Sequence, residues 1–385
     1  MKLLFENWRR YLNEIKINIS SKPKAYVLPH ASSEYSGHIA LELIKNIPDY
    51  EYDSILILGI NHEGGESGIY VGSEYNPDEE KIARIRETGF REVEGDHSIG
   101  HLIPLIESFS DLPIAPFVVT DYDPRISEVL RPLITDSTLI IASTDLSHYN
   151  PLEATGKIDH RTISNMQEEN PELDACGKNA IRILYDLIDE KLELVDYDTS
   201  AHLKGDTEKV VGYGAFQAGG FSKDLLDARD AVKKYLATGE TPEPSGDLRA
   251  AFIGITKNGE LQGSMGQTKP IMSANIAAIE AFKSTLTDPR MQYDPNLIIV
   301  PGNGFEIKIR LFSDMQPTSL EEVTMGKDGL FVESGEKSAV FLPEVPTKEQ
   351  WNHSIYLQEL LKKGEIMDNN FDLYKFQTES IMVIT

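Results

Sequence analysis

The chain has 385 residues, which is long for one hydrophobic core, so two or more domains are expected. Its net charge is −25, because 62 Asp and Glu residues outnumber 37 Lys and Arg residues, and such acidity argues against nucleic-acid binding. No apolar run reaches the roughly 20 residues of a membrane-spanning helix. The single Cys excludes a disulfide framework and, with no export signal at the start, favours a cytoplasmic location.

The first segment, residues 1–23, predicts an amphipathic helix followed by a linker. Its apolar face is formed by Leu4, Trp8, Tyr11 and Leu12. Such a helix could dock on the domain that follows it. The segment also resembles a short leader of some tailed-phage proteins, which implies packaging or sorting, and both interpretations stay open.

Residues 24–237 predict an α/β domain. Apolar, β-rich runs predict strands at 25–28, 54–60, 114–119 and 138–143. Helical periodicity lies between them, at 38–47, 99–109 and 125–134, and a strong amphipathic helix is predicted over 174–192 with Asp174 as its N-cap. Strands that alternate with helices favour a sheet with parallel elements.

A linker rich in Pro, Gly, Ser and acidic residues is predicted at 238–247, before a smaller α+β domain over 248–385. In this second domain Asn258-Gly259 indicates a hairpin turn, and 274–286 indicates a helix. Alternating residues at 305–313 predict a half-buried strand.

Two histidines follow the first two predicted strands directly. His30 comes after the strand at 25–28, and His62 comes after the strand at 54–60. Ligands collect at the carboxyl ends of strands in open α/β sheets, and neutral imidazole binds zinc, copper and iron. The pair therefore indicates a metal or catalytic pocket, with hydrogen-bonded structural histidines as the alternative.

Three further residues could line the same pocket. Asp145 and His148 follow the predicted strand at 138–143, and an acid near an imidazole can orient it, bind metal or act as a base. The alternative for Asp145 is a cap on the next helix. His97 could exchange protons or polarise a substrate, whereas His101, one helical turn later, suits a structural role.

Cys176 is expected in the first turn of the predicted helix at 174–192. A helix dipole there favours the thiolate and so metal binding or nucleophilic chemistry. A buried, inert thiol is the alternative. A GxSxG elbow, a P-loop and a GxGxxG motif are all missing from the sequence, which disfavours common hydrolases and nucleotide-binding domains.

Together these segments resemble the Memo family, the B component of AmmeMemoRadiSam systems. The family's elements HAGYxYSG, LGPNH, EHSIE, SSDLSHY and ACGxxPI resemble, in order, residues 30–37, 58–62, 96–100, 143–149 and 175–181. The similarity covers about residues 24–217.

The resemblance implies a fold like that of class III extradiol dioxygenases and a metal pocket of two His and one Cys. These ligands match His30, His62 and Cys176, while His97, Asp145 and His148 match residues that line the pocket. Iron or copper is favoured as the single transition metal ion, with zinc as a further option. The chain departs from the family at Ser32-Ser33, at Gly100 and at Ala180, but keeps all three implied ligands.

The second predicted domain resembles the Amme component of the same systems. The family patterns LRGCIG, DxRF and LPEVxxxxxW resemble residues 261–266, 288–290 and 342–351. The motif arginine is here Gln262 and the motif cysteine is Ser264, so a thiol-dependent role is lost.

The expected function is that of a transition-metal-binding protein, and the resemblance implies a non-haem iron or copper oxidoreductase of the dioxygenase-like kind. A small molecule or peptide is the expected ligand, and a radical-SAM protein is the implied partner. The alternative is a non-catalytic regulatory or ligand-binding module, which could be phage-borne. The oligomeric state stays open.

Overall fold

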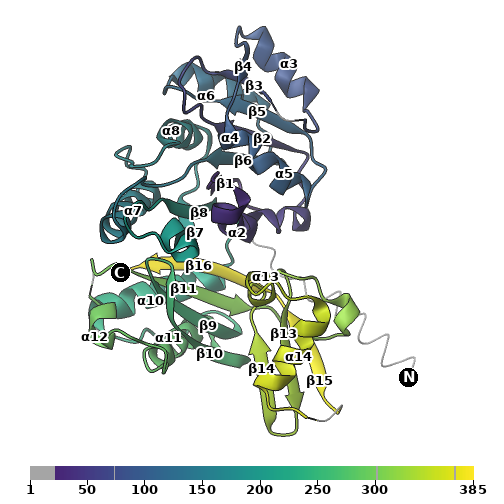
Figure 1. Cartoon of the computed structure of the whole chain (residues 1–385), viewed down its shortest axis with the longest axis vertical. Coiled ribbons are helices and arrows are strands. Elements are labelled where there is room, and N and C mark those ends of the chain that lie inside the picture. The colour runs from purple at the N-terminus through teal and green to yellow at the C-terminus, as the bar shows by residue number, and fades with distance from the viewer. Residues whose placement is uncertain (1–21, 73, 301, 368–369) are drawn as a thin grey trace.

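The computed structural model describes residues 22–72, 74–300, 302–367 and 370–385, so the predicted N-terminal helix lies outside the described residues. The chain forms two halves, one above the other in Figure 1, and β16 lies beside β7 where they meet. Within the described residues, no helix is both long and apolar enough to span a membrane.

The N-terminal half is built on one mixed sheet of eight strands. In spatial order the strands are β4 (Glu92–Glu94), β3 (Gly68–Val71), β5 (Ile114–Val118), β2 (Ser54–Gly59), β6 (Thr138–Ser143), β1 (Ala25–Leu28), β8 (Gly212–Ala218) and β7 (Leu192–Thr199). Four neighbours, β5, β2, β6 and β1, are parallel, which confirms the four predicted strands and their parallel arrangement. The antiparallel pair β8 and β7 extends the sheet beside β1 and was not predicted. The parallel strands place the residues that follow β1, β2 and β6 at one edge of the sheet.

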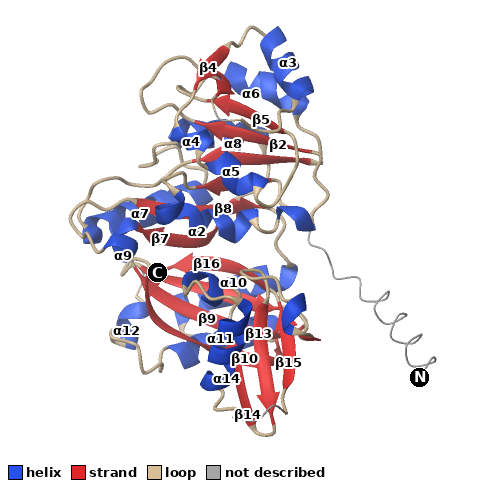
Figure 2. Ribbon diagram, turned by 45° about the vertical axis from the view of Figure 1, so that its right-hand side comes forward, coloured by secondary structure: helices blue, strands red, loops and turns tan. Residues whose placement is uncertain are grey.

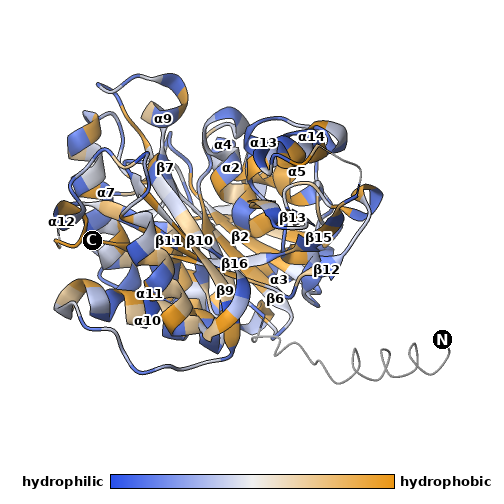
Figure 3. Cartoon of the chain, turned by 90° about the horizontal axis from the view of Figure 1, so that it is seen from below, coloured by the Kyte–Doolittle hydropathy of each residue, from blue (hydrophilic) through white to orange (hydrophobic). Residues whose placement is uncertain are grey.

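Helices cover both faces of this sheet (Figure 2). One face packs against α2 (Ser33–Ile44), α4 (His97–Gly100) and α5 (Leu102–Glu107). The other face packs against α3 (Glu79–Glu87), α6 (Pro124–Leu130), α7 (Leu152–Gln167) and α8 (Lys178–Leu187). Two short 3-10 turns, Ile47–Asp49 and Arg131–Leu133, and helix α9 (Ser200–Lys204) complete the half. In Figure 3 the hydrophobic colour gathers on the strands in the middle of the molecule.

The C-terminal half is α+β, as predicted, with two four-stranded sheets. The first has the order β10 (Glu260–Ser273), β9 (Leu248–Lys257), β11 (Phe305–Phe312) and β16 (Thr378–Ile384). The second has the order β12 (Gln316–Pro317), β15 (Asp372–Phe376), β13 (Gly329–Ser334) and β14 (Lys337–Phe341). The helices are α10 (Lys223–Thr238), α11 (Ala274–Thr285), α12 (Pro295–Ile298), α13 (Val345–Lys348) and α14 (His353–Lys363), with a 3-10 turn at Leu320–Glu322. The predicted hairpin at Asn258-Gly259 and the predicted helix that begins at 274 are both confirmed.

Helix α10 packs into the core of the C-terminal half, although the predicted boundary at 237–238 places it with the N-terminal domain. Its buried residues Leu225, Ala228 and Val232 join the same apolar cluster as Phe282 of α11. The chain between Thr238 and Leu248 therefore connects two elements of one core.

The prediction of a half-buried strand at 305–313 is wrong, because β11 is buried along its whole length. Its apolar residues face the core of its own half, whereas Glu306, Lys308 and Arg310 alternate with them and are also covered. Glu306 and Lys308 pair with side chains of the N-terminal half. The alternation of apolar and polar residues along β11 is as predicted. The polar face, however, packs against the N-terminal half and is not exposed to water.

The turn at Asn258-Gly259 lies against the N-terminal half. Both residues have positive φ, 52° and 84°, as a tight hairpin requires. A Cβ atom on Gly259 would lie 2.0 Å from Asp198 Oδ1, and the Thr199 hydroxyl donates a hydrogen bond to the Asn258 carbonyl.

We expect Gly259→Ala to lower the free energy of unfolding by at least about 2 kcal/mol, because it adds a steric clash with Asp198 to the cost of positive φ. Gly335→Ala is the matched control, since Gly335 has φ 61° in another hairpin and an added Cβ would meet no atom within 4 Å. It should cost about 1 kcal/mol. Urea unfolding of the full chain measures both, and equal losses would contradict the docking of this turn.

Asp159 of α7 supports the segment that follows β6. It is fully buried, its Oδ1 accepts from the Ser147 backbone N–H at 2.9 Å, and its Oδ2 accepts from the Tyr197 hydroxyl at 2.9 Å. Burial raises the pKa of Asp159 to about 6, and the hydrogen bonds from Ser147 and Tyr197 oppose that rise. The folded chain therefore favours the protonated carboxyl more than the unfolded chain does.

This raised pKa predicts a pH dependence with a definite sign. The stabilising contribution of protonated Asp159 is present below about pH 4 and is lost as the pH rises through about 6, by up to about 3 kcal/mol. Asp159→Asn does not titrate, so its stability relative to the parent chain should improve between pH 4 and pH 7. Parallel profiles of urea midpoint against pH for the two proteins would contradict this expectation.

Candidate metal centre

His30 lies at the end of β1 and is buried, with its ring oriented by Ser143 at the end of β6. Its Nδ1 lies 2.8 Å from the Ser143 hydroxyl, which itself donates to the Ser98 carbonyl at 2.5 Å. A hydroxyl has one proton to donate, and Ser143 donates it to the Ser98 carbonyl. The hydrogen bond between His30 and Ser143 therefore uses a proton on His30 Nδ1. In the neutral imidazole, His30 Nε2 then keeps its lone pair, and it lies 3.4 Å from Cys176 Sγ.

His62 follows β2 and is oriented by Asp96. One oxygen of Asp96 accepts from His62 Nδ1 at 2.5 Å and from the His62 backbone N–H at 2.6 Å. Its other oxygen caps α4 by accepting from the Ser98 N–H at 2.8 Å. Asp96 thus fixes the ring by its Nδ1, as in the acid–histidine pairs behind many metal ligands.

The Asp96–His62 pair is strongly polarised. Its hydrogen bond to Asp96, followed by that to Cys176, raises the pKa of His62 to about 10. Burial alone would raise the pKa of Asp96, but the hydrogen bonds from His62 and Ser98 hold it well below its usual range. Metal binding at His62 must therefore displace a proton.

The predicted helix at 174–192 is wrong at both ends, because α8 runs only from Lys178 to Leu187 with Gly177 as its N-cap. The residues before it are bonded to the segment after β6. The Cys176 N–H donates to the Asp145 carbonyl at 3.2 Å, and the Gly177 N–H donates to the Thr144 hydroxyl at 2.8 Å. These bonds hold Cys176 ahead of the helix and beside His30.

The thiol of Cys176 is activated by the two imidazoles and not by a position within the helix. Burial would raise its pKa, but hydrogen bonding with His30 and His62 lowers the pKa of Cys176 to about 7. A substantial fraction of thiolate is therefore present near neutral pH, and thiolate is the form that binds metals.

The three residues converge on one point. One donor atom from each of His30, His62 and Cys176 lies within 4.8 Å of the other two, a spacing that a single metal ion can bridge. A second group, His62, Asp96 and His97, meets the same criterion. In that group the His62 and His97 rings stack in parallel at 4.6 Å, so their lone pairs run side by side and do not converge.

His97 forms a wall of the pocket. Its ring centroid lies 5.4 Å from that of His30 and 5.3 Å from that of His101. Burial lowers the pKa of His97, which favours a neutral imidazole able to accept a proton. His101 Nδ1 lies 2.9 Å from the His30 carbonyl, which suits a structural role.

Asp145 lies inside the pocket and does not cap the following helix. Its Oδ1 accepts from the His30 N–H at 2.8 Å, and its Oδ2 lies 3.9 Å from His30 Nε2. Burial raises the pKa of Asp145 to about 6, against the hydrogen bond from His30 and the charge of His148. Its carboxyl group can therefore exchange a proton near neutral pH.

His148 is on the same segment, but the structure does not bring its ring into the cluster. The ring lies against Tyr149, with 5.7 Å between centroids, and within the described part of the chain no hydrogen bond joins it to His30, His62 or Cys176. Its effect on the pocket is the electrostatic one on Asp145.

The two residues that orient the ligands, Ser143 and Asp96, were not predicted as site residues. They belong to the motif segments at 143–149 and 96–100 without an assigned role in the site. Their partners are 113 and 34 residues away along the chain, so local spacing carries no signal for these bonds.

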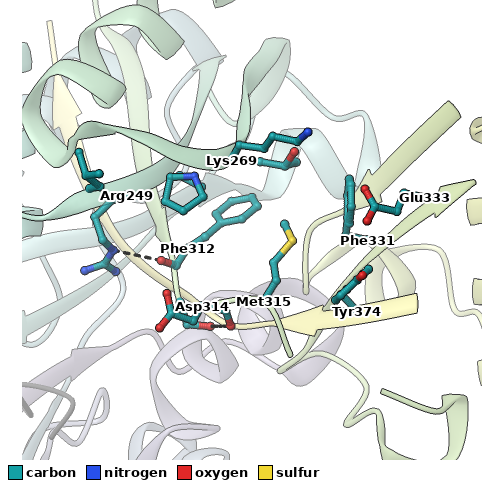
Figure 4. Close-up of a pocket in the computed structure, with 13 residues that line it drawn as sticks. Arg249, Lys269, Phe312, Asp314, Met315, Phe331, Glu333 and Tyr374 are labelled. Carbon is teal, nitrogen blue, oxygen red and sulfur yellow. Dashed lines mark hydrogen bonds between the residues drawn. The ribbon is translucent and has the colours of Figure 1, made fainter. Parts of the chain in front are cut away.

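A separate cavity of about 410 Å³ lies between the two sheets of the C-terminal half (Figure 4). Phe312, Met315 and Phe331 line it, with Lys269 near its rim. Arg249 is occupied by hydrogen bonds to the Phe312 carbonyl, Asp224 and Glu379. The ligand-type residues of the metal centre all lie in the other half.

Comparison with known proteins agrees with this division. Residues 2–217 match the model of the Memo-like protein family, and residues 225–381 match the AMMECR1 family. A MEMO1 family protein of Thermotoga petrophila is 28% identical over 224 residues, which cover 50% of this chain and 81% of that protein. A MEMO1 family protein of Methanocaldococcus jannaschii is 29% identical over 239 residues, covering 50% and 83%.

Among solved structures, an uncharacterized protein from Pyrococcus horikoshii aligns with a TM-score of 0.35 and 23% identity, over 41% of this chain and 89% of that one. The Memo-like match extends over more than half of the chain and includes His30, His62, Asp145 and Cys176. The chain belongs to the Memo family and continues into an AMMECR1 domain.

Proposed function

We propose that the N-terminal half binds one transition metal ion through His30 Nε2, His62 and Cys176 Sγ. The observation that carries the proposal is the convergence of these three donors, each within 4.8 Å of the others. Hydrogen bonds to Ser143 and Asp96 hold the opposite ring nitrogens of the two histidines. Ligands with their second nitrogen fixed in this way are typical of metal sites.

Three protein ligands suit a reactive site more than a purely structural one. Structural zinc sites are usually closed by four protein ligands, whereas catalytic sites leave a position for water or substrate. Two imidazoles and a thiolate accept iron, copper or zinc, of which iron or copper would supply redox chemistry. We favour iron or copper on the family resemblance, and the donor set also admits zinc.

Two residues of the pocket can move protons in such a reaction. Asp145 reaches within 3.9 Å of His30 Nε2 and has a pKa raised by burial to about 6. His97 lies beside His30 and His62, and burial lowers its pKa, which favours the neutral imidazole. We assign them to acid–base exchange with a bound small molecule, and we assign His148 an electrostatic role through Asp145.

The combination of the two halves supports a place in an AmmeMemoRadiSam-type system, in which a radical-SAM protein would be the partner and the metal site would perform an oxidation. The second candidate is a non-catalytic module in which the same pocket holds a metal or a peptide for regulation. The exposure of about one-third of the His62 side chain leaves the pocket open to either type of ligand.

Metal binding is tested by titrating the metal-free full chain with Co²⁺ and following the thiolate–cobalt charge-transfer band. The parent chain should bind one equivalent. Cys176→Ser should lose the band and most of the affinity, because it removes the thiolate. A parent chain that binds no Co²⁺, or a band unchanged in Cys176→Ser, would contradict the proposed centre.

The orienting role of Ser143 gives a finer prediction. Ser143→Ala should weaken Co²⁺ binding about 10-fold to 100-fold, the range usual for loss of a group that orients a ligand, because His30 Nδ1 loses its partner. Ser54→Ala is the matched control, since Ser54 is a buried serine at the opposite end of the neighbouring strand β2. Equal affinities of the two variants would show that the Ser143 contact does not matter.

Oxygen consumption separates the two candidate functions. Chain loaded anaerobically with Fe²⁺ or Cu⁺ is mixed with catechol-type substrates in air-saturated buffer. Catalytic consumption that falls at least tenfold in Asp145→Asn would support an oxidoreductase with Asp145 in a proton-transfer role. Stoichiometric metal binding without turnover would favour the regulatory module.

A further inference from the structure

Strand β11 of the C-terminal half turns a row of charged residues towards the N-terminal half. Glu306, Lys308 and Arg310 alternate along the strand, and all three are less than 10% exposed. Apolar residues between them, such as Ile307 and Ile309, fill the core of the C-terminal half. Charged side chains are rarely this buried unless they are paired, so each must have partners within the interface.

Glu306 connects this strand to helix α7. Its Oε1 lies 3.0 Å from His160 Nε2 of α7, and its Oε2 accepts from the Thr256 hydroxyl at 2.7 Å. The Asn258 N–H also donates to Oε1, at 3.2 Å. Gly304 lies against the His160 ring, where an added Cβ would be 2.8 Å from Nδ1. The C-terminal half therefore contacts His160 in two ways, through the hydrogen bond between Glu306 and Nε2 and through Gly304 beside the ring.

Asp159, the residue next to His160, is hydrogen-bonded to the segment that contributes to the metal pocket. Asp159 accepts a hydrogen bond from the Ser147 N–H at 2.9 Å, and it too is fully buried. Tyr197 contacts both residues. Its hydroxyl donates to Asp159, and its ring makes an edge contact with the His160 ring, with 5.6 Å between centroids. A displacement of His160 therefore moves Asp159 with it.

Ser147 belongs to the short segment that supplies the pocket. Asp145, two residues earlier, binds the His30 N–H through its carboxylate and the Cys176 N–H through its carbonyl. Gly212 of β8 holds the same segment by exchanging backbone hydrogen bonds with Leu146 and Ser147. A continuous series of contacts thus runs from Glu306 through His160 and Asp159 to two of the proposed metal ligands.

A second connection reaches the pocket from Lys308. Its Nζ lies 3.0 Å from Glu42 of α2 and 3.0 Å from Asp196 of β7. Helix α2 begins at Ser33, three residues after His30. Both helices that follow pocket segments, α2 and α7, are therefore anchored on the same strand of the C-terminal half.

We propose that Glu306 is a positioning residue of the metal pocket, and that the AMMECR1 domain of this chain sets the geometry of the Memo-type centre through β11. The inference rests on the proposed metal site. The charged row of β11 acts as a platform for α7 and α2, and these helices hold the segments that carry Asp145 and His30.

The test uses the full chain with Glu306→Met, which removes both acceptor oxygens, and, from the other side of the contact, His160→Phe, which keeps a ring but cannot donate a hydrogen bond. Ile309→Val is the control, because it removes one buried methyl group from the same strand on the face turned away from the N-terminal half. Co²⁺ affinity and the charge-transfer band are measured for each protein. Hydrogen–deuterium exchange of the 144–149 peptide is measured on the metal-free chains.

Each single variant should weaken Co²⁺ binding about tenfold, and the double variant should weaken it to the same extent, since both changes break one contact. Exchange in the 144–149 peptide should become faster in both variants but not in Ile309→Val. Affinity within twofold of the parent, with exchange at 144–149 unchanged, overturns the inference even if the variants unfold at lower temperature.

Co²⁺ binding by the parent chain separates this inference from the proposed function. A parent chain that binds no Co²⁺ overturns both the metal centre and the claim that Glu306 positions it. If the parent chain binds Co²⁺ and the Glu306 and His160 variants bind it equally well, only the positioning role fails. A double variant whose loss equals the product of the single losses also overturns it, because independent effects would then explain the result.

Discussion

The candidate metal centre depends on the hydrogen bonds of one short segment, the chain that leaves β6. Ser143 orients the His30 ring, the Asp145 carboxylate holds the His30 backbone, and the Asp145 carbonyl holds Cys176. Residues more than a hundred positions apart in sequence are brought together by this segment. A buried backbone or side-chain polar group must find a partner, so each of these bonds constrains the others.

The parallel strands explain why the segment lies where it does. β6 pairs with β1 on one side and with β2 on the other, so the residues after all three strands emerge at one edge of the sheet. His30 and His62 then need only short loops to meet. The thiol arrives from a different direction, ahead of α8, where the Cys176 N–H donates to the Asp145 carbonyl.

The interface between the halves follows a different principle. Three charged residues of β11 are buried there. Glu306 and Lys308 pair with α7, α2 and β7 of the N-terminal half, and Arg310 pairs with Glu344, the N-cap of α13, so pairing offsets part of the cost of desolvation. Such pairs add little net stability compared with apolar contacts, but a mispaired arrangement would leave a buried charge without a partner. The interface therefore defines one relative placement of the halves, which is what a positioning role for the C-terminal half requires.

Local sequence patterns were sufficient to predict the elements whose burial follows from their own periodicity. The four buried strands, the hairpin at Asn258-Gly259, the helix from 274 and the placement of His30 and His62 at strand ends all follow from apolar runs and turn chemistry. Family motifs pointed in addition to Cys176 and Asp145 as members of the same pocket. Tertiary contacts decided the rest of the site: α8 starts only after Cys176, Ser143 and Asp96 orient the two histidines, and the His148 ring lies against Tyr149. They also decided that α10 packs into the core of the C-terminal half and that Glu306 is buried. Most of these depend on a partner distant in the chain, and periodicity reports only how a residue relates to its near neighbours.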